Sequence, residues 1–363
     1  MGYVERRSPF LLTPDIPRLL HFVACRFHGA ARRSIMRAMR HALAILSLAA
    51  AVLAGCADTP SSTTTPSHVG FAVVEVPDPQ DRPIELGIWY PATADPAPMD
   101  LGLSRQMVAR NAPMAGRDLP LIVISHGTGG GIPSHADTAT ALAQAGFVVA
   151  APTHNGDNYR DDSYVGTGRW LPERARHVHR VIDYMRTEWA GHDRLDGRVG
   201  IFGFSAGAFT ALVVVGGVPD MRQVTRHCET ARELACTLWK KPPAPASDWT
   251  HDPRVSAAVV AAPGLGFAFE PDGLAHLTAA VQLWSAGDDR VVLYGTNTAL
   301  VRRQLPSSEY HEVPRAGHMS FLVPCPGGPP PLCRDADGFD RAAFHAEFNR
   351  AAIAFFRARL EKR

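Results

Sequence analysis

A serine flanked by glycines lies between two apolar runs of this sequence. The residues Gly203-Phe204-Ser205-Ala206-Gly207 follow the run 199–202 and precede the run 208–215. A G-x-S-x-G pattern at a strand-to-helix junction is typical of the sharp turn that exposes a nucleophilic serine, and a Cβ at either glycine would crowd the adjoining elements. Because such short patterns also arise by chance, Ser205 is a candidate nucleophile only if suitable partners follow.

A carboxylate and a histidine follow Ser205 in the chain, each after an apolar run. Residues 279–285 and 309–313 predict two strands, which lead into Asp289 and His318 respectively. Taken singly, an aspartate beside glycine is a common turn residue and a histidine after glycine can belong to a loop. The joint order of nucleophile, acid and base, each at a strand end, favours a catalytic triad of Ser205, Asp289 and His318.

A glycine-rich loop, 126–131, follows the apolar segment 119–125. Acyl transfer places negative charge on a carbonyl oxygen, and two fixed backbone N–H groups must point at it. The residue after the nucleophile, Ala206, and Thr128 in this loop are the candidates for this oxyanion hole. The loop could instead bind phosphate, but position 132 is isoleucine where the dinucleotide pattern needs glycine, and no Gly-Lys-Ser/Thr follows.

The surrounding pattern predicts an α/β fold. Continuous apolar runs alternate with helical segments, which indicates a mostly parallel central sheet with helices on both faces. The clearest runs are 121–124, 147–151 and 257–262. Residues 71–76 and 84–90 alternate more strongly and predict an antiparallel edge, while 340–360 carries phenylalanines at helical spacing and predicts a core-packed closing helix.

A long polar insert, 216–254, separates the helix after Ser205 from the strand at 257–262. Long loops in compact domains are usually functional or disordered. The insert contains Cys228 and Cys236, which argue against disorder, so it is either a cap that narrows the substrate pocket or a surface loop.

Several further residues adjoin motif ends. Thr128, His154 and Met319 are expected near the reaction centre for this reason. His177 and His179 are two residues apart on a predicted helix, so they should point to different faces, and we expect both at the surface.

These motifs, in this order, resemble the bacterial dienelactone-hydrolase-like branch of the α/β-hydrolase superfamily, which is also similar to platelet-activating-factor acetylhydrolases and secreted polyester hydrolases. The resemblance runs from about Gly70 to the C-terminus. Besides the motifs above, it rests on Leu86–Pro91, Ala151-Pro152-Thr153-His154, Asp252-Pro253-Arg254-Val255 and Phe321–Cys325. The Asp-x-x-Val endings of related sequences favour Asp289 over the rival acid Asp288, because Val291 and Val292 follow it.

The resemblance implies an α/β-hydrolase fold and a serine carboxylic-ester hydrolase with no cofactor and no metal. Dienelactone hydrolases resemble this chain but have cysteine at the nucleophile position. Ser205 therefore favours an ordinary carboxylic ester, small or lipid-like, as the substrate. An amidase, a peptidase or a phospholipid acetylhydrolase would use the same triad, because the fold does not fix the substrate. A non-catalytic binding lipoprotein of the cell envelope is the remaining alternative.

The N-terminal region has the pattern of an export signal. Arginines precede an apolar segment that ends in Leu-Ala-Gly-Cys at Cys56, which resembles the bacterial lipobox, so residues 36–55 are expected to be a lipoprotein signal peptide and Cys56 the lipidation site. Residues 1–35 do not fit a signal and are expected to be an upstream extension outside the true start. Residues 56–69 are rich in Ser, Thr and Pro and predict a tether to the hydrolase domain at 70–363.

Cysteine use and charge agree with export. Outside the leader and Cys56, four cysteines remain, and sequence-local pairing of Cys228 with Cys236 and Cys325 with Cys333 is favoured among three possible connectivities. Removing the eight arginines, Glu5 and Asp15 of residues 1–55 from the totals of 37 basic and 35 acidic residues leaves 29 basic and 33 acidic residues. This balance does not indicate the excess of basic residues that is typical of nucleic-acid-binding proteins. We expect a lipid-anchored protein facing the periplasm, or a secreted one.

Overall fold

The structure is a computed structural model that describes residues 68–239, 241, 243, 248–329 and 331–360. The chain divides into the units Met1–Thr63 and Thr64–Arg363, and all of the described residues belong to the second. The predicted upstream extension, signal peptide, lipidation site and nearly all of the tether therefore lie outside the described residues. The first strand begins at His68, two residues before the expected start of the domain.

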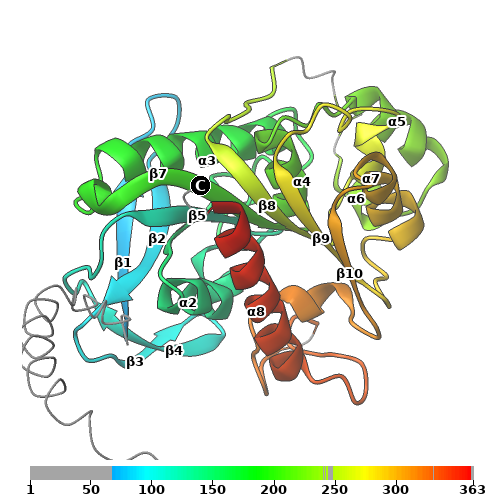
Figure 1. The fold of residues 1–363 in the computed structure, drawn as a ribbon. Helices are drawn as coiled ribbons and strands as arrows, with labels where there is room; N and C mark the ends of the chain where they lie inside the picture. The colour runs from blue at the N-terminus through cyan, green and yellow to red at the C-terminus, as the bar shows by residue number, and fades with distance from the viewer. Residues whose placement is uncertain (1–67, 240, 242, 244–247, 330, 361–363) are drawn as a thin grey trace, which may run out of the picture. The chain divides into compact units, whose positions relative to one another are not determined.

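The described residues form a mixed sheet of ten strands in the order β10-β9-β8-β7-β5-β6-β2-β1-β4-β3 (Figure 1). Neighbouring strands from β10 to β6 are parallel, whereas β2 pairs antiparallel with both β6 and β1. The strands are β1 (His68–Val76), β2 (Ile84–Ala92), β3 (Ala97–Leu101), β4 (Ser104–Arg110), β5 (Leu119–Ser125), β6 (Val148–Pro152), β7 (Leu195–Phe204), β8 (Val255–Ala261), β9 (Ala280–Ala286) and β10 (Glu309–Val313).

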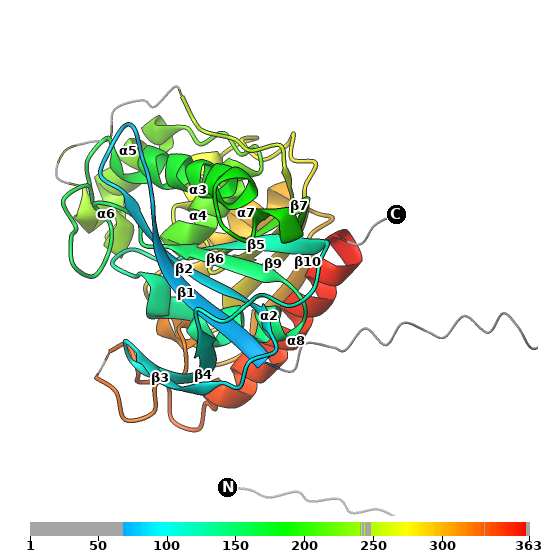
Figure 2. The same ribbon diagram turned by 90° about the vertical axis from the view of Figure 1, so that its left-hand side faces the viewer.

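Helices cover both faces of the sheet, as Figure 2 shows with α3 and α4 on one side and α2 and α8 on the other. The helices are α2 (Ala136–Gln144), α3 (Trp170–Thr187), α4 (Ala206–Val214), α5 (Met221–Thr230), α6 (Leu234–Leu238), α7 (Thr298–Gln304) and α8 (Arg341–Leu360). The predicted fold class, α/β with a mostly parallel sheet between helical layers, is confirmed.

The alternation of side chains along β5 builds two apolar cores, one on each face of the sheet. Leu121 and Val123 belong to the core under α3 and α4, whereas Ile122 and Ile124 belong to the core under α2 and α8. Each of these strand residues is at most 2% exposed. Burial of both faces explains why the central strands are continuously apolar in sequence.

The antiparallel part of the sheet differs from the expectation. β1 and β2 are antiparallel, but they are not the edge, because β4 and β3 extend the sheet beyond β1. The sequence pattern missed this hairpin because β3 is largely exposed and β4 buries only part of its length, so neither has the continuous apolar run of the central strands.

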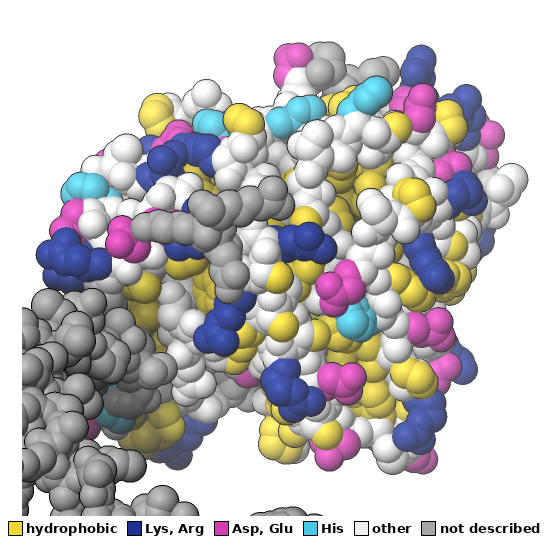
Figure 3. All heavy atoms as spheres, viewed as in Figure 1, with side chains coloured by type: hydrophobic (Ala, Val, Ile, Leu, Met, Phe, Trp, Pro, Cys, Tyr) yellow, Lys and Arg dark blue, Asp and Glu magenta, His cyan; other side chains and the backbone are white. Residues whose placement is uncertain are grey.

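The cysteines of the described residues form the two predicted sequence-local disulfides, Cys228–Cys236 and Cys325–Cys333. On the face shown in Figure 3, basic and acidic side chains are interspersed rather than gathered by sign. Over the part of the chain that is described, each helix is too short or too polar to cross a membrane.

Candidate active site

Ser205 stands at a strained turn between β7 and α4. Its backbone has φ 56° and ψ −118°, in a region that side-chain-bearing residues rarely adopt. The turn is held by the Ser205 N–H, which donates to Ala261 O at 3.0 Å. A Cβ on Gly203 would lie 2.1 Å from the carbonyl oxygen of Gly207, so the first glycine of the motif is required by the close approach of β7 and α4.

The structure brings Ser205, His318 and Asp289 together in a line. His318 Nε2 lies 2.9 Å from Ser205 Oγ, and His318 Nδ1 lies 2.7 Å from Asp289 Oδ2. The side chains of His318 and Asp289 are each 4% exposed. The three residues come from the ends of β7, β10 and β9, which are parallel strands, so the same edge of the sheet presents all of them.

The second oxygen of Asp289 is also engaged. Asp289 Oδ1 accepts from the N–H groups of Val291 and Val292 at 2.9 and 2.8 Å. These bonds fix the carboxylate so that Oδ2 faces the imidazole. Asp288, the rival acid, is exposed, and the structure does not bring its side chain to His318.

The backbone N–H of Thr128 lies in the loop that follows β5. Within this loop, Gly130 N–H donates to Gly127 O at 3.0 Å, and Gly129 N–H donates to Asp157 Oδ1 at 2.8 Å. Among the described residues, the Thr128 N–H has no hydrogen-bond acceptor. Thr128 and Ala206 line the same cavity as Ser205 and His318, which is where the predicted oxyanion hole requires them.

A cavity of about 680 Å³ opens onto Ser205 and His318. Its wall is mostly apolar and comes from three surface segments: the turn between β3 and β4, the insert that carries α6, and the loop closed by Cys325–Cys333. These segments contribute Leu101 and Leu103, Leu234 and Leu238, and Leu332. The insert thus reaches the cavity through the loop that Cys228–Cys236 closes.

Of the other two residues expected near the reaction centre, one lies there and one does not. Met319 lines the cavity, but His154 does not. His154 is fully buried behind the loop, where its Nε2 lies 2.9 Å from Ser125 Oγ and its backbone N–H donates to His126 Nε2. The expectation of a surface position was wrong for His177. This residue is fully buried, and its Nδ1 lies 3.3 Å from the Nδ1 of His154.

His177 and His179 do point to different faces of α3, as expected. His177 lies on the face that packs against the sheet, whereas His179 contacts Asp252 at 2.9 Å. Burial, together with the nearby Arg176, lowers the pKa of His177 to about 3, so its ring is neutral at physiological pH.

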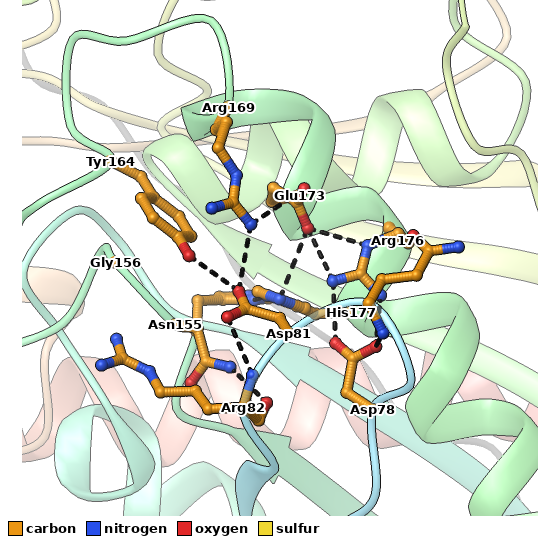
Figure 4. Close-up of polar contacts among 12 residues, drawn as sticks. Asp78, Asp81, Arg82, Asn155, Gly156, Tyr164, Arg169, Glu173, Arg176 and His177 are labelled. Atoms are coloured by element: carbon orange, nitrogen blue, oxygen red, sulfur yellow. Dashed lines mark hydrogen bonds and ion pairs between the residues drawn. The ribbon is translucent and has the colours of Figure 1, made fainter.

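One group of side chains has the composition of a metal site. Asp81, Glu173 and His177 turn toward one another (Figure 4), with candidate ligand atoms within 4.8 Å of each other. However, Arg169 Nη2 lies 3.2 Å from Asp81 Oδ2 and 3.4 Å from Glu173 Oε1, and Arg176 Nε lies 2.7 Å from Glu173 Oε2. Guanidinium groups already neutralise both carboxylates, so the group is an ion-pair network.

Sequence reasoning missed Asp157 and Arg174, which form a buried ion pair at 2.5 Å, with both side chains 1% exposed. Asp157 accepts the Gly129 N–H, which places the pair directly behind the Thr128 loop. A signal was present, because Arg174 interrupts the apolar face of α3 at helical spacing from Leu171 and Val178. A charged residue on a buried helix face needs a partner.

The comparisons with known proteins agree with this architecture. Residues 98–179 match the family described as platelet-activating factor acetylhydrolase, isoform II. This match includes the Thr128 loop, Asp157 and Arg174, and it ends before Ser205. No curated protein gave a significant match. A ferulic acid esterase from Streptomyces cinnamoneus is similar in structure, with a TM-score of 0.56 and 21% identity over 83% of this chain and 92% of that chain. That likeness shows the α/β-hydrolase fold.

Proposed function

We propose that the protein is a serine carboxylic-ester hydrolase that acts through an acyl-enzyme on Ser205. The observation that carries the proposal is the line of hydrogen bonds from Ser205 Oγ through His318 to Asp289 at the floor of one apolar cavity. The names of the matched family and of the structural neighbour both denote ester hydrolysis, which favours an ester over an amide.

In this mechanism His318 acts first as a base and then as an acid. Its Nε2 accepts the Ser205 proton as Oγ attacks the ester carbonyl carbon, and the N–H groups of Thr128 and Ala206 stabilise the oxyanion. Collapse of the tetrahedral intermediate breaks the bond to the leaving oxygen, which takes the proton from His318. Water then hydrolyses the acyl-enzyme by the same steps, while Asp289 holds the imidazole tautomer.

The cavity favours an uncharged ester with an apolar acyl or alcohol group. Its volume of about 680 Å³ is within the range of small-molecule sites, and its lining is dominated by aliphatic side chains, glycines and backbone. Leu234 and Leu238 place the insert on this wall, which supports a cap that selects the substrate over a surface loop with no role.

The test is hydrolysis of p-nitrophenyl esters from acetate to long acyl chains, with Ser205→Ala beside the wild type. We expect turnover in the wild type and a loss on the order of a million-fold in the variant, as for the nucleophile of a well-studied serine protease. A fluorophosphonate probe should label the wild type alone. A folded wild type that is neither labelled nor active would favour the binding lipoprotein, whereas faster cleavage of a matched amide would favour an amidase or peptidase.

Export and lipid anchoring at Cys56 are part of the same proposal. The lipobox-like segment and the two disulfides support a location in the cell envelope or outside the cell. Metabolic labelling with an alkyne-bearing fatty acid, compared between wild type and Cys56→Ser, would test it.

A further inference from the structure

Arg174 is a buried arginine that contacts neither the cavity nor solvent. It lies on α3 with 1% of its side chain exposed. Its Nη1 donates to Asp157 Oδ2 at 2.5 Å, its Nη2 donates to His126 O, and its Nε donates to Thr210 Oγ1 at 3.1 Å. The guanidinium therefore joins three separate segments: the loop after β5, the segment after β6, and α4.

The first connection holds the peptide of Thr128 from both sides. The carbonyl of His126, two residues before it, accepts from Arg174, and the N–H of Gly129, just after it, donates to Asp157 Oδ1 at 2.8 Å. His126 Nδ1 also lies 2.7 Å from Gly127 O. The loop that offers the Thr128 N–H is thus fixed through Arg174 and its partner.

The second connection reaches the other candidate oxyanion donor. Thr210 Oγ1 donates to Ala206 O at 2.9 Å while it accepts from Arg174 Nε. Ala206 is the first residue of α4, so this bond fixes the turn that presents its N–H. Thr210 is fully buried, and its hydroxyl uses one donor and one acceptor site within this chain of bonds.

We propose that Arg174 is a positioning residue that sets the distance and angle between the Thr128 and Ala206 N–H groups. The inference rests on the proposed function. Oxyanion donors work only when they are aimed in advance at the oxygen that develops charge, and a displacement of about 1 Å can cost a hundredfold in rate. Arg174 bonds rigidly to both donor-bearing segments and to no atom that would touch substrate. A fully buried charge pair is weak evidence for a stabilising role, so a positioning role accounts better for the presence of an arginine at this place.

The experiment uses two matched pairs of variants in the full-length protein. Arg174→Lys keeps the charge beside Asp157 but loses the planar contacts to His126 and Thr210, and Arg176→Lys makes the same change two residues along α3 in a pair with Asp78 and Glu173. Thr210→Val replaces only the hydroxyl with a methyl group, and it tests the proposal even if Arg174→Lys does not fold. Thr210→Ser retains the hydroxyl.

The measurements are kcat and KM on a p-nitrophenyl ester, and the affinity of an alkyl boronic acid that forms a tetrahedral adduct with Ser205. We expect Arg174→Lys and Thr210→Val to lower kcat about tenfold to a hundredfold with KM within twofold of wild type, and to weaken boronate binding by a similar factor. Arg176→Lys and Thr210→Ser should stay within threefold of wild type on every measure.

Two results would overturn the inference and leave the proposed function intact. In the first, kcat is unchanged in both Arg174→Lys and Thr210→Val. In the second, kcat falls in these variants, but their boronate affinity is unaltered and the fluorophosphonate still labels Ser205. Loss of rate in Arg176→Lys equal to that in Arg174→Lys would also count against it, since it would reveal a general effect of α3. A wild type that takes no label and cleaves no ester refutes the proposed function and this inference together.

Discussion

Gly207 and Ser125 approach each other so closely that no side chain fits between them. A Cβ built on Gly207 would lie 1.9 Å from the carbonyl oxygen of Ser125 and 2.7 Å from that of His126. Backbone carbonyls cannot move aside as a flexible side chain can. The contact joins the helix that follows Ser205 to the strand that precedes the glycine-rich loop. Gly207, the second glycine of the motif, therefore sets how closely α4 can approach β5.

Gly207→Ala should therefore destabilise the protein by about 3 kcal/mol or more, because the methyl group forces α4 away from β5. The surviving folded fraction should also lose activity, since Ala206 moves with α4. Urea unfolding followed by circular dichroism measures the first effect. Gly168→Ala is the control, because a Cβ there meets no atom within 4 Å. Equal stability of the two variants would refute the close-packing argument.

Asp289→Asn should lower kcat by roughly a thousandfold to ten-thousandfold, because the amide favours the wrong imidazole tautomer while its shape is unchanged. Asp288→Asn changes an exposed side chain of the same size one residue away, so its activity should be close to that of the wild type. Steady-state kinetics on one p-nitrophenyl ester would compare them. If Asp288→Asn were the more damaging change, the assignment of the acid would be wrong.

Leu234→Asp should reduce kcat/KM for long-chain esters about tenfold and leave acetate hydrolysis nearly unchanged, because Leu234 lies on the cavity wall rather than beside the nucleophile. Val218→Asp is the matched control: it places the same charge on an exposed apolar residue of the insert that does not line the cavity. A chain-length series measures the effect. Identical profiles for both variants would show that the insert does not select the substrate.

His135 makes stability depend on pH. Burial lowers its pKa to about 4, and the ring packs edge-on to Phe202 and Phe204 at centroid distances of 5.0 and 5.5 Å. An unfolded chain takes up the proton near pH 6.5 whereas the native ring stays neutral until about pH 4, so stability falls as the pH drops across this window.

His135→Phe should remove that dependence. Between pH 7 and pH 4.5 we expect the variant to lose about 2 kcal/mol less stability than the wild type, measured by urea unfolding at both values. Other acid-sensitive groups are shared by the two proteins and cancel in the difference. The exposed His276→Phe serves as control. A wild type and a His135→Phe variant with parallel pH profiles would contradict the buried neutral state.

The sequence predicted the central part of the fold well because buried parallel strands have a strong signature. The predicted strands 279–285 and 309–313 correspond to β9 and β10, and the predicted helix 340–360 to α8. The order of Ser205, Asp289 and His318 along the chain then placed three side chains at one sheet edge, since parallel strands end together. The roles assigned to them and to the oxyanion donors remain predictions.

The predictions that failed concern how deeply a side chain is buried, not the order of the motifs along the chain. The segment after a strand can present a residue to the cavity, as it does Met319 after β10, or bury one away from the cavity, as it does His154 after β6. A helical histidine can lie on either face, and the expectation for His177 overlooked its spacing: it is four residues before Val181 and eight before Met185, on the buried stripe of α3. Spacing could identify Arg174 as a charge on a buried helix face, but it could not identify Asp157 as the partner, because the two residues meet only through tertiary packing.

The contact between Trp170 and the buried ion pair limits how the cavity of this protein can be enlarged. Its indole lines the cavity, and its Nε1 donates at 2.6 Å to Asp157 Oδ2, the same oxygen that Arg174 contacts. Enlarging the cavity at Trp170 would therefore leave that carboxylate short of a donor beside the glycine loop. Leu234 and Leu332, on loops that disulfides close, carry no such connection to Asp157. Directed evolution for bulkier esters should accumulate substitutions at these leucines and spare the tryptophan.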